Sequence, residues 1–152
     1  MQQAQADGSA RSIGISNFSA GEIDALLAEA DVKPVVNQVQ FSPWKYRRGL
    51  LEKCEAEGIA LEAYSPFMTG RKLDDETVAA VAERHERTAA QVLLRWGVQR
   101  GVIEIPKSEH RERIEANAHI FDFELSDRDM AELDALDETG GTAEAQESKW
   151  WS

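Results

Sequence analysis

The chain has little cysteine, no long apolar run and no excess of positive charge, and each absence narrows what it can be. Cys54 is the one cysteine among 152 residues, which excludes an internal disulfide and fits a reducing compartment. It lies in the apolar-periodic stretch Leu50–Cys54, so we expect a buried helix residue rather than a reactive thiol. No segment has the roughly 18 apolar residues of a membrane span, and the first residues contain no apolar signal-peptide core. These features favour a cytoplasmic location.

Charge and histidine spacing exclude further classes of protein. The formal net charge is −11 and the isoelectric point is near 4.7, which argues against nucleic acid and anionic membranes as partners. A local basic pocket for a phosphate is still compatible with that balance. His85, His110 and His119 have no metal-ligand spacing, and we expect His85 on a solvated helix face. The sequence has no glycine-rich phosphate loop and no nucleophile elbow.

Strand-like and helix-like segments alternate along residues 11–137, and the chain has one domain's length. We predict strands over Ser12–Ser16, Val35–Gln40, Ile59–Tyr64 and Val102–Ile105. We predict helices over Ala20–Ala30, Arg47–Glu57, Asp74–Arg87, Thr88–Arg100, Glu109–Ala118 and Ser126–Leu136. Alternation at this spacing indicates a parallel α/β sheet. A complete (β/α)₈ barrel needs at least about 200 residues, so we expect a partial barrel of about four βα units with one or two extra helices.

The ends of several predicted helices carry recognisable signals. Ser19 with Glu22 forms a capping box, Ser126 with Asp129 resembles one, and Thr88 caps a third helix. Glycines at positions 58 and 101 end two helices. We expect residues 1–10 to be a linker or truncated start, and residues 138–152 to be a flexible tail.

The run Ile105-Pro106-Lys107-Ser108 is the strongest functional signal in the sequence. It places the end of a strand, a lysine, a hydroxyl and a helix start in one loop, with Arg113 and Asn117 following at helical spacing. The free N–H groups and positive dipole of a helix N-terminus attract a phosphate. Lys107 and Arg113 add charge, and Ser108 can cap the helix and donate a hydrogen bond. The alternative is an ordinary strand-to-helix loop with a solvated lysine.

Polar residues also end the three earlier strands. Ser16 and Asn17 follow the first, Gln38 lies near the end of the second, and Tyr64 and Ser65 end the third. In a parallel sheet the carboxyl ends of the strands are where ligands bind. The alternative interpretations are that Ser16 and Asn17 are plain turn residues, that Gln38 is an amide inside the barrel, and that Tyr64 is a core residue.

Six runs together resemble the C-terminal half of an aldo-keto reductase, in the family's order and roughly its spacing. They are Gly14–Phe18, Asn37–Gln38, Ala63–Pro66, Ala90–Trp96, Ile105–Ser108 and Phe121–Ser126. The resemblance implies NADP (NADPH) as the cofactor and hydride transfer between a small carbonyl and an alcohol. It implies that Ser16, Asn17 and Gln38 would hydrogen-bond the nicotinamide carboxamide, and that Tyr64 would stack on the ring.

The same resemblance assigns residues to the remaining parts of the cofactor. Its pyrophosphate path would be lined by Ser65, Phe67 and Thr69. Lys107, Ser108 and Arg113 would bind the 2′-phosphate, and Asn117 would meet the adenine. Ala116 stands where family members often carry an adenine-binding carboxylate or amide, and Met68 stands where a glycine is frequent.

The family's acid/base aspartate, tyrosine, lysine and histidine lie on earlier strands, so the resemblance assigns no catalytic residue here. We interpret Glu62 as a barrel-interior or ion-paired residue, with Arg11 on the first strand as the candidate partner. The leading hypothesis is the cofactor-binding half of an oxidoreductase, inactive alone and completed by a complementary half-barrel. The alternatives are a non-catalytic nicotinamide-nucleotide-binding module and a structural half-barrel that dimerises. Unpaired sheet edges predict self-association in either case.

Overall fold

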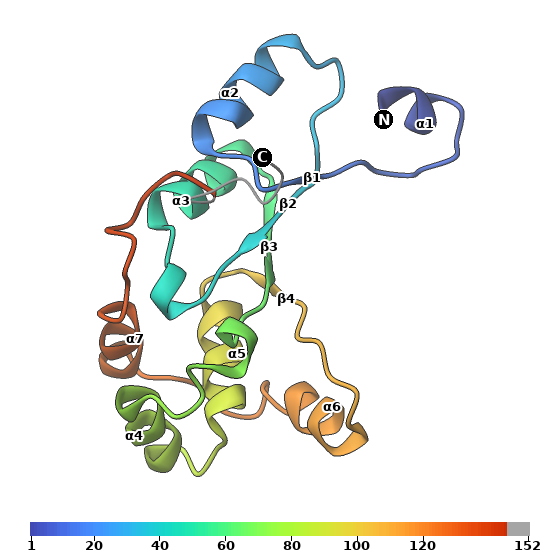
Figure 1. Cartoon of the computed structure of the whole chain (residues 1–152). Helices are drawn as coiled ribbons and strands as arrows, with labels where there is room; N and C mark the ends of the chain where they lie inside the picture. Colours follow the sequence, from blue (N-terminus) through green and yellow to red (C-terminus); the bar gives the residue numbers. More distant parts are fainter. Residues whose placement is uncertain (146–152) are drawn as a thin grey trace.

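A parallel sheet of four strands forms the centre of the computed structural model, which describes residues 1–145 (Figure 1). The strands are β1 (Ile15–Ser16), β2 (Val36–Gln40), β3 (Ala60–Tyr64) and β4 (Ile103–Glu104), in the spatial order β1-β2-β3-β4. Each strand pairs in parallel with the next, in a register that aligns Ser16 with Gln38 and Gln38 with Glu62. Parallel neighbours require crossover connections, which the helices supply. The predicted partial barrel is confirmed.

Helices connect the strands and extend the fold beyond the end of the sheet. They are α1 (Gln2–Ala6), α2 (Ala20–Glu29), α3 (Arg48–Glu57), α4 (Glu76–Arg84), α5 (Ala89–Gln99), α6 (Arg111–Ala118) and α7 (Asp127–Asp134), with single turns η1 (Pro43–Lys45) and η2 (Met68–Gly70). In Figure 1, α2 and α3 form one group beside the strands, while α5 lies between α4 and α6 in a second group. Among the described residues, no helix is both long and apolar enough to cross a membrane.

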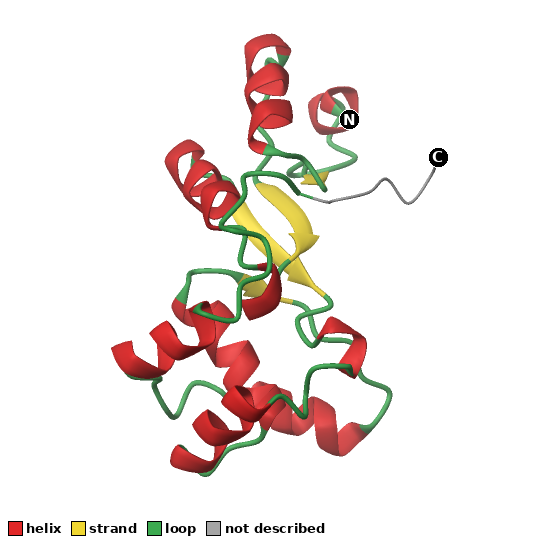
Figure 2. Ribbon diagram, turned by 60° about the vertical axis from the view of Figure 1, so that its left-hand side comes forward, coloured by secondary structure: helices red, strands yellow, loops and turns green. Residues whose placement is uncertain are grey.

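Side chains of the two central strands alternate between two environments, as expected of a sheet covered by helices on one face. On β2, Asn37 and Val39 are fully buried, while Gln38 and Gln40 are only partly covered. The buried amide of Asn37 donates to the Phe18 carbonyl oxygen at 2.9 Å and faces Cys54 on α3. The Cys54 side chain is fully buried, so the prediction of a structural cysteine is confirmed. The opposite face of the sheet, seen beside the helices in Figure 2, carries the polar residues of the site.

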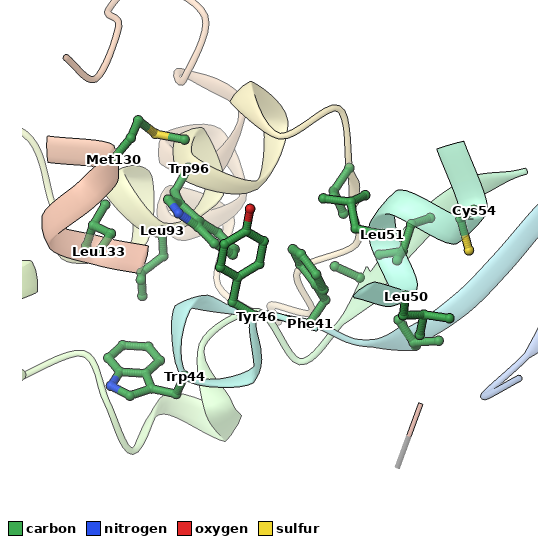
Figure 3. Close-up of a cluster of buried hydrophobic side chains, with 14 of the residues drawn as sticks. Phe41, Trp44, Tyr46, Leu50, Leu51, Cys54, Leu93, Trp96, Met130 and Leu133 are labelled. Atoms are coloured by element: carbon green, nitrogen blue, oxygen red, sulfur yellow. The ribbon is translucent and has the colours of Figure 1, made fainter. Parts of the chain in front are cut away.

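An aromatic cluster joins the end of β2 to the second group of helices (Figure 3). Phe41 stacks on Trp96 with ring centroids 5.3 Å apart, and Tyr46 meets both rings edge-on. The Trp96 indole N–H donates to the Asp134 carboxylate at 2.8 Å, so α7 is held to α5 by a satisfied polar contact. Aromatic pairs of this kind contribute about 0.5–1.5 kcal/mol each beyond their buried area.

The predicted capping signals are present in the structure. Ser19, Thr88 and Ser126 each accept a hydrogen bond from the backbone N–H of the third helical residue, and each belongs to a reciprocal capping box. Gly58 ends α3 with φ of 65°, a left-handed conformation that favours glycine. The observed bounds of the helices and strands lie within about three residues of the predicted ones. The outer strands β1 and β4 are shorter than predicted because each pairs on one side only.

Residues 1–10, expected to be a linker or truncated start, contain the short helix α1. Glutamine and alanine are good helix formers, and nothing interrupts them before Gly8, where φ is 80°. The Gln2 side-chain oxygen accepts from the Val32 N–H at 2.8 Å, and the Gln5 amide donates to the Arg11 carbonyl oxygen. The helix is therefore tied to the body of the protein.

Residues 138–145 form the first part of the expected flexible tail. That segment returns to α2 and α3, where Ala143 O accepts from Ala20 N at 3.0 Å and Gly141 O accepts from Gly49 N at 3.0 Å. Arg47, itself buried, donates to the Glu144 carbonyl oxygen at 2.6 Å. Backbone groups that find partners in this way hold a glycine-rich segment in place. The remaining part of the predicted tail, with Trp150 and Trp151, lies outside the described residues.

His85 is also placed differently from the prediction. It ends α4, and its ring nitrogen lies 2.9 Å from the Asp129 carboxylate of α7, with 19% of the side chain exposed. Arg84 contacts the same carboxylate at 2.6 Å. Tertiary packing of α7 against α4 covers a residue that the sequence of α4 alone leaves on the solvent side.

Candidate functional site

A cavity of about 900 Å³ lies at the carboxyl ends of β3 and β4, where the following loops meet the starts of α5 and α6. Eight of the eleven residues predicted for cofactor binding line it. They are Tyr64, Ser65, Phe67, Thr69, Lys107, Ser108, Arg113 and Asn117. The volume is in the range of cavities that hold small molecules and cofactors.

One end of this cavity is basic. Lys107 and Arg113 both line it and are both exposed, and they flank the N-terminus of α6. The predicted capping role of Ser108 is wrong, because His110 occupies the N-cap position and makes no side-chain cap. The Ser108 hydroxyl oxygen instead accepts from the His110 N–H at 3.2 Å, which folds the loop before the helix begins. The first N–H groups of α6 therefore have no side-chain cap.

The three remaining predicted residues, Ser16, Asn17 and Gln38, do not line the cavity, but Asn17 contacts the lining residue Tyr64. The Tyr64 hydroxyl donates to Asn17 Oδ1 at 3.2 Å, and the Ser16 hydroxyl donates to the Gln38 carbonyl oxygen at 3.0 Å. The Gln38 amide donates to the Glu62 carboxylate at 2.5 Å. These polar side chains come from β1, β2, β3 and the residue after β1, so the parallel register brings together residues separated by up to 47 positions in sequence.

Glu62 belongs to this cluster, as the prediction of a barrel-interior residue proposed. Its carboxylate accepts from the Gln38 amide, whereas Arg11 lies exposed before β1. The contact orients Gln38, because an amide whose N–H₂ faces a carboxylate presents its oxygen to the other side. The structure thus indicates that Glu62 positions the side-chain amide of Gln38, one of the residues predicted to bind the cofactor.

Two residues that start the loops of the site have left-handed backbones. Asn17 has φ of 58° and Ser65 has φ of 52°, and Met68 and Thr69 in η2 follow with φ of 49° and 59°. Hydrogen bonds hold these conformations, since Asn17 N donates to Gln38 O and Met68 N donates to Ser65 O, each at 2.9 Å. Backbone strain of this kind gathers at ligand sites, where surrounding contacts enforce it.

Sequence reasoning missed several residues of the cavity wall. Leu73, Thr88, Ala90 and Ile105 make part of it, and Glu109 stands at its basic end. Glu109 was detectable in principle, because it follows Lys107 by two positions and has the opposite charge. Leu73 gave no such signal, since only the fold of the loop after β3 brings it to the cavity. Among the described residues, no group of three potential ligands is placed to hold a metal ion.

The fold and the site together define a parallel α/β-barrel protein with its ligand cavity at the carboxyl ends of the strands. The Aldo/keto reductase family model matches residues 1–138. The chain is 48% identical over 136 residues to glyoxal reductase of Bacillus subtilis (strain 168), covering 90% of this chain and 49% of that protein. It is 46% identical over 144 residues to morphine 6-dehydrogenase of Pseudomonas putida, covering 86% and 49%.

Solved structures agree with this assignment. A crystal structure of a Bombyx mori aldo-keto reductase in complex with NADP has a TM-score of 0.84 and 37% identity to this chain, covering 90% of this chain and 48% of that one. A deep-sea metagenome aldo-keto reductase has a TM-score of 0.88 at 32% identity, covering 98% and 57%. The chain belongs to the aldo-keto reductase family. It spans about half the length of the curated relatives that it matches.

Proposed function

We propose that this chain provides the nicotinamide-nucleotide-binding part of an NADPH-linked oxidoreductase that interconverts small carbonyl compounds and alcohols. The observation that carries the proposal is that eight predicted cofactor residues, from two segments of the chain more than 35 positions apart, line one cavity. The NADP-bound structure of a relative and the names of two others, a glyoxal reductase and a morphine 6-dehydrogenase, support it.

The residues fit the chemistry of a phosphorylated dinucleotide. Tyr64, Phe67 and Leu73 give the cavity aromatic and apolar surface, suited to a flat ring system. Lys107 and Arg113 supply positive charge at the other end, beside the uncapped start of α6, where a phosphate is favoured. Asn117 adds an amide that can both donate to and accept from a base edge.

In this proposal the protein holds and orients the cofactor, which supplies the hydride when bound. Tyr64 offers its ring face to the nicotinamide, and its hydrogen bond to Asn17 fixes the rotation of the phenol. Gln38, oriented by Glu62, and Ser16 hold the carboxamide. Because the bound cofactor is already oriented, its rotational freedom is lost on binding and does not have to be lost again on the way to the transition state.

Protonation of the alkoxide that follows hydride transfer needs a general acid. Tyr46 is 4% exposed and packs inside the aromatic cluster, and the Tyr64 hydroxyl donates to Asn17. Neither tyrosine presents a phenol suited to this role. We therefore propose that the 152-residue polypeptide binds cofactor but needs a complementary half-barrel for turnover.

A binding experiment tests the proposal. Calorimetric titration of the 152-residue polypeptide with NADPH should give saturable binding, micromolar or weaker, accompanied by quenching of tryptophan fluorescence. Tyr64→Ala should weaken binding, while Arg111→Ala should not. Arg111 is a matched control because it lies on the same helix as Arg113, pairs with Glu115 and stays outside the cavity. Absence of NADPH binding by the folded polypeptide would refute the proposal.

A further inference from the structure

The basic end of the cavity contains an ion pair of its own. Lys107 Nζ lies 2.8 Å from Glu109 Oε1, and both side chains line the cavity. Both are also largely exposed, at 85% and 77%. The lysine that would bind a phosphate is thus already in contact with a carboxylate from its own loop.

The two anions compete for the same ammonium group. A phosphate that approaches Lys107 must either displace Glu109 or share the lysine with it, and two neighbouring negative charges repel each other. NADH carries no 2′-phosphate and meets no such competition. Glu109 therefore opposes NADPH binding without opposing NADH binding to the same extent.

On the basis of the proposed function, we propose that Glu109 is a specificity-determining residue, which lowers the preference of this site for NADPH over NADH. Lys107 and Arg113 still favour the phosphorylated cofactor, but by less than they would with a neutral residue at position 109. Exposed ion pairs are weak, so the effect of Glu109 should be about two- to fivefold in affinity.

Two other charged residues near the start of α6, Arg111 and Glu112, do not explain the proposed effect on cofactor preference. Glu112 lies in the first turn of α6 and is exposed, but it does not line the cavity, and the ion pair of Lys107 is with Glu109. Arg111 pairs with Glu115 at 2.7 Å, away from the loop. Glu112 therefore serves as a control for the general effect of removing one negative charge near the helix N-terminus.

The experiment compares dissociation constants for NADPH and NADH in the parent polypeptide, Glu109→Gln and Glu112→Gln. Glu109→Gln should tighten NADPH binding about two- to fivefold and raise the NADPH/NADH preference by a similar factor. Glu112→Gln should change the affinities for the two cofactors by similar, smaller factors. Adenosine 2′-monophosphate and adenosine serve as a second ligand pair that tests the phosphate loop alone.

A double-mutant cycle then shows whether Glu109 acts through Lys107. In the Lys107→Ala background, Glu109→Gln should give no more gain in NADPH affinity than Glu112→Gln does. An unchanged NADPH/NADH ratio in Glu109→Gln, or an undiminished gain without Lys107, overturns the inference and leaves the proposed function standing. If the parent binds none of the four ligands, the proposed function fails and this inference fails with it.

Discussion

The carboxyl group of Glu104 on β4 lies directly over Gly97 on α5. A Cβ added to Gly97 would approach Glu104 Oε1 to 1.6 Å and its Cδ to 2.7 Å, so the glycine leaves the space that the carboxyl occupies. Glu104 Oε2 is buried without a hydrogen-bond partner among the described residues, and burial raises the pKa of this carboxyl to about 9. Glu104 lines a second cavity together with the apolar residues Leu94, Val98 and Val102.

A substitution of Gly97 tests this contact. Gly97→Ala should destabilise the protein by about 1–2 kcal/mol, because the new methyl group forces the carboxyl out of its place. In a Glu104→Ala background the same change should cost less than about 0.5 kcal/mol, since alanine is the better helix former. Urea unfolding of the four variants measures the coupling, and equal costs in both backgrounds would show that the carboxyl is not the obstacle.

The raised pKa of Glu104 predicts a pH dependence of stability. The native carboxyl, with a pKa of about 9, holds its proton over a range in which the unfolded carboxyl, with a pKa near 4.5, has lost it. This contribution to stability is complete below pH 4.5 and is lost as the pH rises towards 9. Glu104→Gln should therefore gain stability relative to the parent progressively from pH 5 to pH 9, by about 1–3 kcal/mol at the upper end.

Urea unfolding at pH 5, 7 and 8.5 measures this difference. Glu124→Gln, which replaces an exposed carboxylate, is the control and should follow the parent at all three pH values. A constant difference between Glu104→Gln and the parent across the range would contradict the prediction.

Asp129 should make the opposite contribution. Burial alone would raise its pKa, but hydrogen bonds from Ser126, His85 and Arg84 outweigh burial and hold the pKa well below its usual range. A depressed pKa stabilises the native state above pH 4 and loses that contribution as the pH falls below the ordinary value of 3.8. Asp129→Asn should cost about 3 kcal/mol at pH 7, because it leaves the partners of a buried carboxylate unpaired.

The cost of Asp129→Asn should shrink between pH 5 and pH 2. Glu132→Gln is the matched control, because Glu132 also contacts Arg84 but lies at the surface of the same helix. Surface ion pairs contribute at most about 1 kcal/mol, so this variant should stay close to the parent. Equal costs for the two variants would show that burial of Asp129 does not matter.

Lys107 and Arg113 should set the preference for the phosphorylated cofactor. Lys107→Ala or Arg113→Ala should narrow the NADPH/NADH affinity ratio about tenfold, the usual effect of losing one charge-assisted contact. Arg111→Ala, on the same helix but outside the cavity, should leave the ratio unchanged. Titration of each variant with both cofactors gives the ratios. Equal affinities for NADPH and NADH in the parent polypeptide would refute the assignment of the 2′-phosphate site.

The outer strands predict self-association of the 152-residue polypeptide. Within the described residues, β1 and β4 each pair on one side only, and Ile103 on β4 is 46% exposed. Unpaired edges and exposed apolar residues favour pairing with a second copy or with a complementary half-barrel. Sedimentation at tens of micromolar should show association, which Ile103→Lys should weaken.

Ile114→Lys is the control for this experiment, because Ile114 is similarly exposed, at 53%, but lies on α6 rather than at the sheet edge. A folded monomer of the parent polypeptide at this concentration would contradict the prediction, as would an equal effect of both lysine substitutions.

Local sequence determined the elements and most of the site. Capping residues such as Ser19 and Thr88 act within one helical turn, so they fix where a helix begins whatever surrounds it. The run Ile105–Ser108 likewise carries a strand end and a basic loop within a few residues, and the structure places that loop at the cavity. Eight of the predicted cofactor residues line that cavity, and Tyr64, Ser65, Lys107 and Ser108 among them lie within contiguous family motifs.

Tertiary structure decided what depends on residues far apart in sequence. The contacts of Asn17 with Tyr64 and of Gln38 with Glu62 follow from strand register, which no single motif contains. The packing of residues 138–145 against α2 and α3, and the burial of His85 against Asp129, depend on how helices meet in space. Burial of a charged or polar group is a property of its neighbours, so the sequence set the chemistry of these groups while the fold set their surroundings.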